Sequence, residues 1–312
     1  MELKHIYKIT VNGQDITDIL QKNAASLSLQ DAAGILSDEL TIAVAGDFER
    51  PKYKDELKLW LGYEGENLTY MGLFKVQTTE RLNKSMTITA TSAEFAESLK
   101  VKNTRSYENM SLKEIALKIG QNQGLEVKSD CDDLFFTHIS QTAESDLSFL
   151  KRLANKYNLI FSIKNNLLIF KKILNDQGKN PDLPVFELDA KETDGSLRIK
   201  HSNKTFYSAC LAAWHDTKQN KTQKILHGSG SPVLKIKDSF KNEQEACLKA
   251  KAKLQTANKG TKTGSASLAG SAIFAGSTLK LFNSFEDDGE YTIKSVSHDV
   301  SSKWSTTIDF EN

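Results

Sequence analysis

The sequence predicts a mainly β protein in which an α+β module separates two β-barrel regions. Apolar and polar residues alternate through the first hundred positions and again toward the C-terminus, and a helical periodicity replaces this alternation in between. Many short alternating strands are typical of small barrels and sandwiches. The 312 residues exceed what one hydrophobic core usually supports, so we expect two or three domains.

The first region, residues 1–98, is expected to form a β-barrel domain. Asn12-Gly13 follows the first alternating run and suits the positive φ angles of a tight hairpin. Each run has one apolar face, which indicates a strand with one side in a core. The alternating runs cover residues 7–11, 27–29, 40–44, 57–63, 68–76 and 86–90.

The middle region, residues 99–183, has the pattern of an α+β domain. Ser111 and Glu114 form a capping box, in which both side chains satisfy free backbone amides at a helix start. A second helix with a broad apolar stripe is expected over residues 145–157. An alternating run then reaches Asn165-Asn166, which suits a hairpin turn.

The third region, residues 184–312, is expected to form a second β-barrel domain. A polar stretch that holds two of the four prolines precedes it and suits a domain boundary. One amphipathic helix is expected as an insertion around residues 242–257. Residues 226–239 match no pattern that we can assign. Strands are expected at 197–200, 207–214, 223–227, 277–282, 291–298 and 306–310.

Charge and composition exclude several functional classes. Lys plus Arg number 41 and Asp plus Glu number 40, so the formal net charge of +1 provides no overall field for nucleic acid or acidic membranes. No stretch has the length and apolarity of a signal peptide or a membrane span. We therefore expect a chain that folds in the cytoplasm, without specific nucleic-acid binding.

The cysteines and glycines carry no recognised catalytic signature. Cys131, Cys210 and Cys247 are odd in number and lack CxxC spacing, so buried free thiols are expected, with a catalytic cysteine as the less favoured alternative. The glycines of residues 260–276 lack the order of a phosphate-binding loop. This stretch predicts a tight inter-domain approach, a flexible connector or a subunit contact. No cofactor is expected.

Two groups of acidic residues are candidates for a metal site or a catalytic site. Asp130, Asp132 and Asp133 could hold calcium, but they lack the DxDxDG pattern, so an exposed turn is favoured and no metal is expected. Glu144 and Asp146 could form the carboxylate pair of a hydrolase. Acids interacting with a helix dipole are the simpler explanation, so no catalytic residue is assigned.

The remaining polar and aromatic candidates favour structural roles. The four histidines nearest the strand patterns form no Ser-His-Asp signature. The lysines of the last helix mark its solvent side, and the tryptophans lie inside strand patterns, which favours core or interface positions over carbohydrate binding. These residues are His201, His215, His227 and His298; Lys249, Lys251, Lys253 and Lys259; and Trp60, Trp214 and Trp304.

Three stretches together resemble the phage late control protein D family. The most specific is residues 141–154, QTAESDLSFLKRLA, with the strand pattern of 157–161, which is similar to the family's Q-x-x-E-S-D-x-x-F-L-x-R-L segment. Residues 99–125 resemble the entry into the family's first helix. Residues 274–298 resemble its closing barrel, with a G-x-Y-x-I-x-x-V-x-H pattern, and residues 57–76 are a weaker fourth match.

This resemblance implies a non-enzymatic baseplate hub of a contractile phage tail, similar to the N-terminal part of type VI secretion spike proteins. It implies two tube-like barrels per chain and a homotrimer that joins the six-fold tail tube to the three-fold central spike. The implied partners are the tail tube protein and the spike protein, with the tape measure and other baseplate proteins as further candidates. The implied location is the virion tail baseplate, assembled in the host cytoplasm. The alternatives are a baseplate-associated peptidoglycan hydrolase and a carbohydrate-binding β protein.

Overall fold

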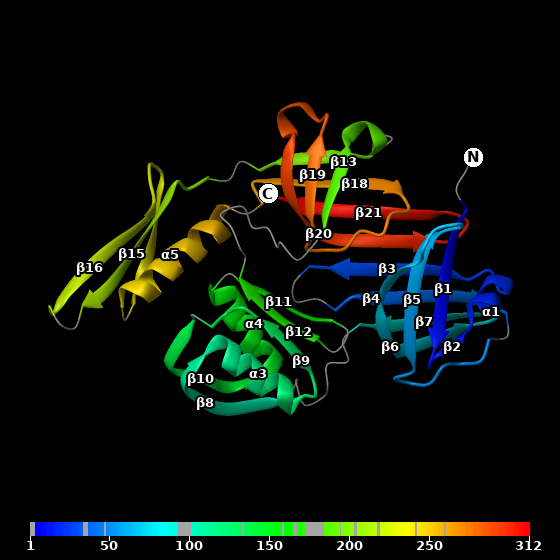
Figure 1. Ribbon diagram of the computed structural model, residues 1–312, viewed down its shortest axis with the longest axis horizontal. Coiled ribbons are helices and arrows are strands. Elements are labelled where there is room, and N and C mark those ends of the chain that lie inside the picture. Colours follow the sequence, from blue (N-terminus) through cyan, green and yellow to red (C-terminus); the bar gives the residue numbers. More distant parts are fainter. Residues whose placement is uncertain are drawn as a thin grey trace.

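The computed structural model of the chain describes residues 4–33, 37–46, 48–92, 101–132, 134–157, 159–164, 167–172, 184–193, 195–202, 205–216, 219–240, 242–258 and 260–312. Strands dominate these residues, and the prediction of a mainly β chain is confirmed. Figure 1 shows three parts: a large sheet, an α+β module below it, and a small unit that extends to the left.

Among the described residues, the large sheet has 13 strands, which come from both the N-terminal and the C-terminal parts of the chain. Its order is β14-β18-β21-β20-β3-β4-β7-β6-β5-β1-β2, and β19 pairs with β20 and β13 beside this path. The N-terminal strands are β1 (His5–Val11), β2 (Gln14–Asp15), β3 (Ser26–Ala32), β4 (Glu39–Ala45), β5 (Glu56–Tyr63), β6 (Thr69–Leu82) and β7 (Ser85–Thr91). The C-terminal strands are β13 (Val185–Asp189), β14 (Arg198–His201), β18 (Lys262–Ala269), β19 (Thr278–Phe282), β20 (Gly289–Val300) and β21 (Trp304–Glu311).

The N-terminal strands follow the predicted alternation. In β4 every second side chain is buried, and these side chains enter a core shared with β3, β5, β6 and β7. Asn12 and Gly13 have φ angles of 49° and 86°, which confirms the predicted tight turn between β1 and β2. The short helix α1 (Thr17–Lys22) follows and was not predicted.

The prediction of two closed barrels is not confirmed. Among the residues that the structure describes, the strand pairings of the main sheet run along an open path from β14 to β2. The two halves instead share one ladder, because β3 pairs antiparallel with β20 from Ala32 and Ser295 to Leu27 and Val300. The N-terminal core accordingly includes Val300 and Trp304 from the C-terminal half.

The middle module contains two small sheets and two helices. Its elements are β8 (Lys102–Ser111), α3 (Leu112–Asn122), β9 (Glu126–Ser129), β10 (Phe135–Ser145), α4 (Asp146–Tyr157), β11 (Leu159–Lys164) and β12 (Leu167–Lys172). The capping box is confirmed: Ser111 Oγ accepts from Glu114 N at 3.2 Å, and Glu114 Oε2 accepts from Ser111 N at 2.6 Å. Leu150 and Leu153 of α4 are fully buried in the module's core. The predicted Asn165-Asn166 turn lies outside the described residues.

Strands that we assigned to the second barrel form a separate sheet. β15 (Ala209–Asp216) lies between β16 (Lys221–Gly228) and β17 (Val233–Phe240), and α5 (Glu243–Asn258) covers one face. We call residues 205–258 the inserted unit. The helix expected near 242–257 is therefore present, but it packs on this sheet. Residues 226–239, which matched no pattern, complete β16 and form most of β17.

The inserted unit has a narrow base. Tyr207 N donates to Asn258 Oδ1 at 2.8 Å, and Asn258 Nδ2 donates to Tyr207 O at 2.8 Å. One asparagine side chain therefore satisfies both backbone groups of a residue 51 positions away, at the point where the chain enters and leaves the unit. Figure 1 shows that the rest of the unit extends away from the main sheet.

The prediction that the lysines of α5 face solvent is wrong for Lys249. Its side chain is only 9% exposed because α5 packs against α4. Lys249 Nζ donates to Lys156 O at 2.5 Å and lies 4.1 Å from the centre of the Tyr157 ring. Burial, reinforced by the charge of Lys156, lowers the pKa of Lys249 to about 7. Lys253 is exposed as predicted, and Lys259 lies outside the described residues.

Candidate assembly site

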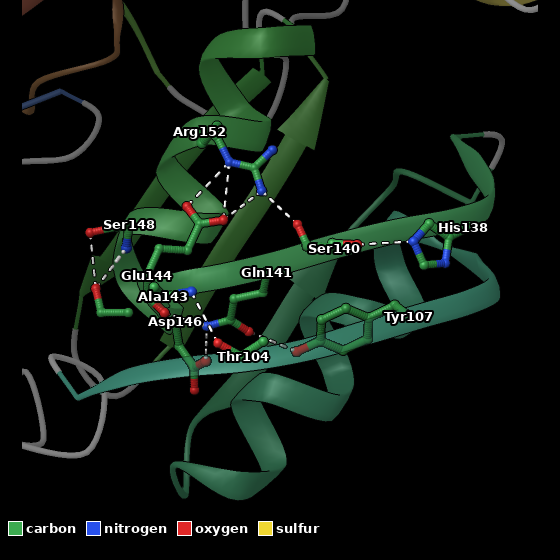
Figure 2. Close-up of polar contacts among 11 residues, drawn as sticks. Thr104, Tyr107, His138, Ser140, Gln141, Ala143, Glu144, Asp146, Ser148 and Arg152 are labelled. Carbon is green, nitrogen blue, oxygen red and sulfur yellow. Dashed lines mark hydrogen bonds and ion pairs between the residues drawn. The ribbon is translucent and has the colours of Figure 1, made fainter.

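The QTAESD segment forms the junction between β10 and α4 (Figure 2). The pairing of β10 with β8 shifts register between Gln141 and Glu144. Ala143 has a φ of 49° within this bulge, and its backbone N–H donates to Thr104 Oγ1 at 3.2 Å. A bulge changes the direction of a strand, and here it leads β10 directly into the helix.

A buried hydrogen-bond network lies beneath this junction. Asp146 is fully buried and accepts hydrogen bonds from Gln141 Nε2 at 2.8 Å, Gln123 Nε2 at 3.2 Å and Arg105 Nη2 at 3.3 Å. Gln141 is also fully buried; its amide nitrogen donates to Glu144 O at 2.9 Å. Because a buried carboxylate needs donors, these contacts make Asp146 the point that joins β8, α3, β10 and α4.

The exposed side of the junction has a different ion pair. Arg152 donates through Nε to both carboxylate oxygens of Glu144 at 3.2 Å, and through Nη2 to Ser140 O at 2.9 Å (Figure 2). Ser145 Oγ accepts from Ser148 N at 3.1 Å and so caps the first turn of α4. The whole motif therefore fixes the angle between a strand and a helix.

Both acids that were candidates for a hydrolase pair, Glu144 and Asp146, have structural partners. Asp146 is enclosed by three donors, and Glu144 is held by Arg152. Sequence reasoning identified Glu144 and Asp146 from the motif, but it missed Arg105 and Gln123. No local signal marks these two residues, because β8 and the end of α3 contribute them from outside the motif.

The acidic residues near position 130 are engaged with protein groups. Asp132 pairs with Lys113 at 3.1 Å, and Asp130 accepts a hydrogen bond from Cys131 Sγ. Asp133 lies outside the described residues. Within the described part of the chain, no group of three or more His, Cys, Asp or Glu residues has the geometry of a metal site.

The thiols and the imidazoles occupy structural positions. Cys131 and Cys210 are buried and free, as predicted, and Cys247 is free and half-buried. Burial raises the pKa of the Cys210 thiol. His298 is fully buried, contacts Thr306 Oγ1 and Ile273 O at 3.1 Å each, and has a pKa lowered by burial.

Other histidines and the tryptophans are also integrated in the fold. His201 Nε2 contacts Asp287 Oδ1 at 2.7 Å, and His215 and His227 lie on β15 and β16 of the inserted unit. Trp304 is 6% exposed in the N-terminal core, as predicted for an interior position, and Trp214 is half-buried against the core of the inserted unit. Trp60 is half-buried beside Tyr70.

The glycine-rich stretch packs closely on β21 of its own half and also contacts the N-terminal half. A Cβ atom on Gly270 would lie 2.1 Å from Trp304 Cδ2, and one on Gly264 would lie 2.3 Å from Phe310 Cζ. Gly270 O also accepts a hydrogen bond from Tyr63 Oη of the N-terminal half at 2.8 Å. This hydrogen bond is a close contact between the two halves, whereas the positions of Gly264 and Gly270 are restricted by β21 itself.

The chain is thus a mainly β scaffold protein. The polar residues of the 141–154 motif hold β10 and α4 at a fixed angle. The chain belongs to the phage tail baseplate hub (GPD) family, which it matches over residues 75–304. The resemblance inferred from the sequence is thereby confirmed. The chain is a component of the virion tail baseplate.

A curated relative agrees with this membership, and solved structures share the fold. The chain is 29% identical over 267 residues to a probable baseplate hub protein of Escherichia phage 186, an alignment that covers 77% of this chain and 67% of that protein. A tail protein from Neisseria meningitidis MC58 has a similar fold, with a TM-score of 0.69, 10% identity and coverage of 99% and 97%. The E. coli type VI secretion component c3393 has a TM-score of 0.56, 10% identity and coverage of 97% and 76%.

No helix in the described residues combines the length and apolarity needed to cross a bilayer.

Proposed function

We propose that three copies of this chain form a hub that adapts the six-fold tail tube to the three-fold central spike. The β3–β20 ladder carries this proposal. It joins an N-terminal and a C-terminal β unit edge to edge, so that each chain contributes two units to one continuous surface. Three such chains supply six units around one axis, which matches both symmetries.

The hydrogen bonds around this ladder support a fixed relation between the two units. Ala33 N donates to Lys294 O at 2.7 Å, and Gln30 Nε2 donates to Ser297 Oγ at 2.6 Å. An adaptor needs such rigidity, because two units that rotated freely would not maintain a constant spacing around a ring. We propose that the units are tube-like domains of residues 1–98 and 184–312, the second interrupted by the inserted unit, and that the domain of residues 99–183 separates them.

The proposed partners are further copies of the chain, the tail tube protein and the spike protein, with the tape measure and other baseplate proteins at the same hub. The nearly neutral chain, with a formal charge of +1, lets copies approach without long-range repulsion. The c3393 protein, described as structurally similar to T4 tail proteins gp27 and gp5, supports other tail proteins as neighbours.

We also propose that the hub acts by binding alone. Arg152 holds Glu144, and Gln141, Gln123 and Arg105 surround Asp146, so both motif acids already have structural partners. Clearing of a peptidoglycan suspension tests this directly: we expect none. Clearing that Glu144→Gln abolishes would identify the protein as a hydrolase instead.

The stoichiometry of the hub in assembled tails tests the adaptor. We expect a reconstruction of the baseplate to contain three copies around the axis, with the β3–β20 ladder intact and both β units lining the same ring. Two or six copies per ring would contradict the proposal, as would a ring lined by only one unit of each chain.

A further inference from the structure

The connection between β19 and β20, residues 283–288, presents an exposed phenylalanine on a constrained turn. Phe285 is 90% exposed, and Phe282 at the end of β19 is 40% exposed. Phe285 has a φ of 60°, in the left-handed region that bulky residues rarely occupy. Holding an apolar side chain both in water and in a strained conformation costs stability, so the arrangement calls for a compensating role.

Several hydrogen bonds hold this tip in place. Ser284 N and Oγ both donate to Asp288 Oδ1, at 2.6 and 2.8 Å, and Tyr291 Oη donates to Asp287 O at 2.7 Å. Asp287 Oδ1 contacts Lys262 Nζ at 2.8 Å and His201 Nε2 at 2.7 Å. The tip is thus tied to β14, β18 and β20, so Phe285 is pre-organised and loses little freedom on binding.

The charges beside Phe285 restrict its partner. The sequence from residue 285 is FEDDGE, and Glu286 and Asp288 are exposed on either side of Asp287. An acidic tip is repelled by the phosphates of nucleic acid and by anionic lipid headgroups. Its chemistry fits a shallow protein depression with basic residues against which a phenyl ring can pack.

The chain itself has such a depression on α4. This depression is shallow and open to solvent, and it is lined by Ser148, Lys151, Arg152, Asn155 and Lys156. The aliphatic stems of its three basic residues provide apolar contact, and their charged groups form the rim. The guanidinium of Arg152 is kept in place by Glu144 and lies 5.2 Å from the centre of the Phe149 ring.

Figure 1 shows that the β19–β20 connection and α4 lie in different parts of the chain. The β19–β20 connection lies at the top of the main sheet, whereas α4 lies in the module below the sheet. A contact between unlike surfaces of two copies repeats around an axis and closes into a ring when the rotation permits. We infer that the Phe285 tip of one copy docks into the α4 depression of the next copy.

This inference rests on the proposed trimer and specifies a contact within it. The hub recovered from assembled tails is treated with a zero-length carbodiimide, which joins carboxylates to lysines in direct contact. We expect dimer and trimer bands of the chain on denaturing gels, with peptide mass spectrometry linking Glu286 to Lys151 or Lys156. A trimer without this link, or a link from Glu286 to a different protein, would overturn the inference and leave the trimer standing. Absence of the trimer would contradict the proposed function itself.

Charge exchange provides the second test. We expect Glu286→Lys or Lys151→Glu alone to reduce the yield of cross-linked or intact trimers about tenfold or more, and the two together to restore it. Phe285→Ala is expected to have a similar effect without lowering the stability of the isolated chain. Phe206→Ala, at another exposed phenylalanine (59%), is the matched control and should leave the trimer unchanged. Equal behaviour of these two alanine variants would refute docking by the tip.

Discussion

Replacing Asp146 by alanine is expected to destabilise the middle module by about 3 kcal/mol. The change leaves one buried N–H of Gln141 without an acceptor, which costs roughly 1–3 kcal/mol. It also removes an acid from the first turn of α4, worth about 0.3–1 kcal/mol. Arg105 reduces the loss, because its side chain is 32% exposed and can turn to water. Gln123 also loses its acceptor on Asp146. Together these losses amount to about 3 kcal/mol.

Glu144→Ala is the matched control from the same motif. Its carboxylate is 20% exposed and its partner Arg152 is 44% exposed, so the loss should be about 1 kcal/mol or less. The three tryptophans lie outside this module, so their fluorescence would not report its opening. Hydrogen exchange of the α4 amides measures the relevant free energy. Equal losses in the two variants, or a loss below about 0.5 kcal/mol for Asp146→Ala, would refute the buried-network argument.

Three further outcomes are expected. Leu150→Ala should cost about 2–5 kcal/mol, because its fully buried side chain leaves a cavity; α4 hydrogen exchange unchanged from wild type would contradict this. The pKa of Lys249 is about 7 when folded and 10.5 ordinarily, so the unfolded chain binds more protons between these values and stability should rise with pH, by about 2 kcal/mol from pH 7 to 9. Denaturation should show that Lys249→Met removes this rise and Lys253→Met keeps it. Gly270→Ala should lower the urea midpoint followed by tryptophan fluorescence, because its Cβ would lie 2.1 Å from Trp304.

Local signals predicted the elements that depend on neighbouring residues. Alternation placed the strands of the N-terminal half because each has one buried face, as in β4. The capping box at Ser111 and the turn at Asn12 are also local, since the chemistry of a few consecutive residues determines their backbone angles. The α4 motif was specific enough to indicate the family before any contact was known.

The features that the sequence did not predict depend on contacts between residues far apart in the chain. Alternation in β3 and β20 indicates strands, but it does not indicate that they pair with each other across 267 positions, as Gln30 and Ser297 do. The strands of the inserted unit carry the same alternation as those of the main sheet, so they were assigned to the same barrel. Lys249 has the sequence context of a solvated helix face, and only the packing of α5 on α4 buries it.

Because Tyr207 and Asn258 are paired, the inserted unit can change in evolution with little effect on the main sheet. Since its two ends meet at one residue pair, the unit is a detour that returns the chain to its starting point before β18 begins. Lengthening, shortening or exchanging the segment between these residues would leave the strand order of the main sheet unaltered. Variation in the inserted unit is therefore compatible with an unchanged main sheet.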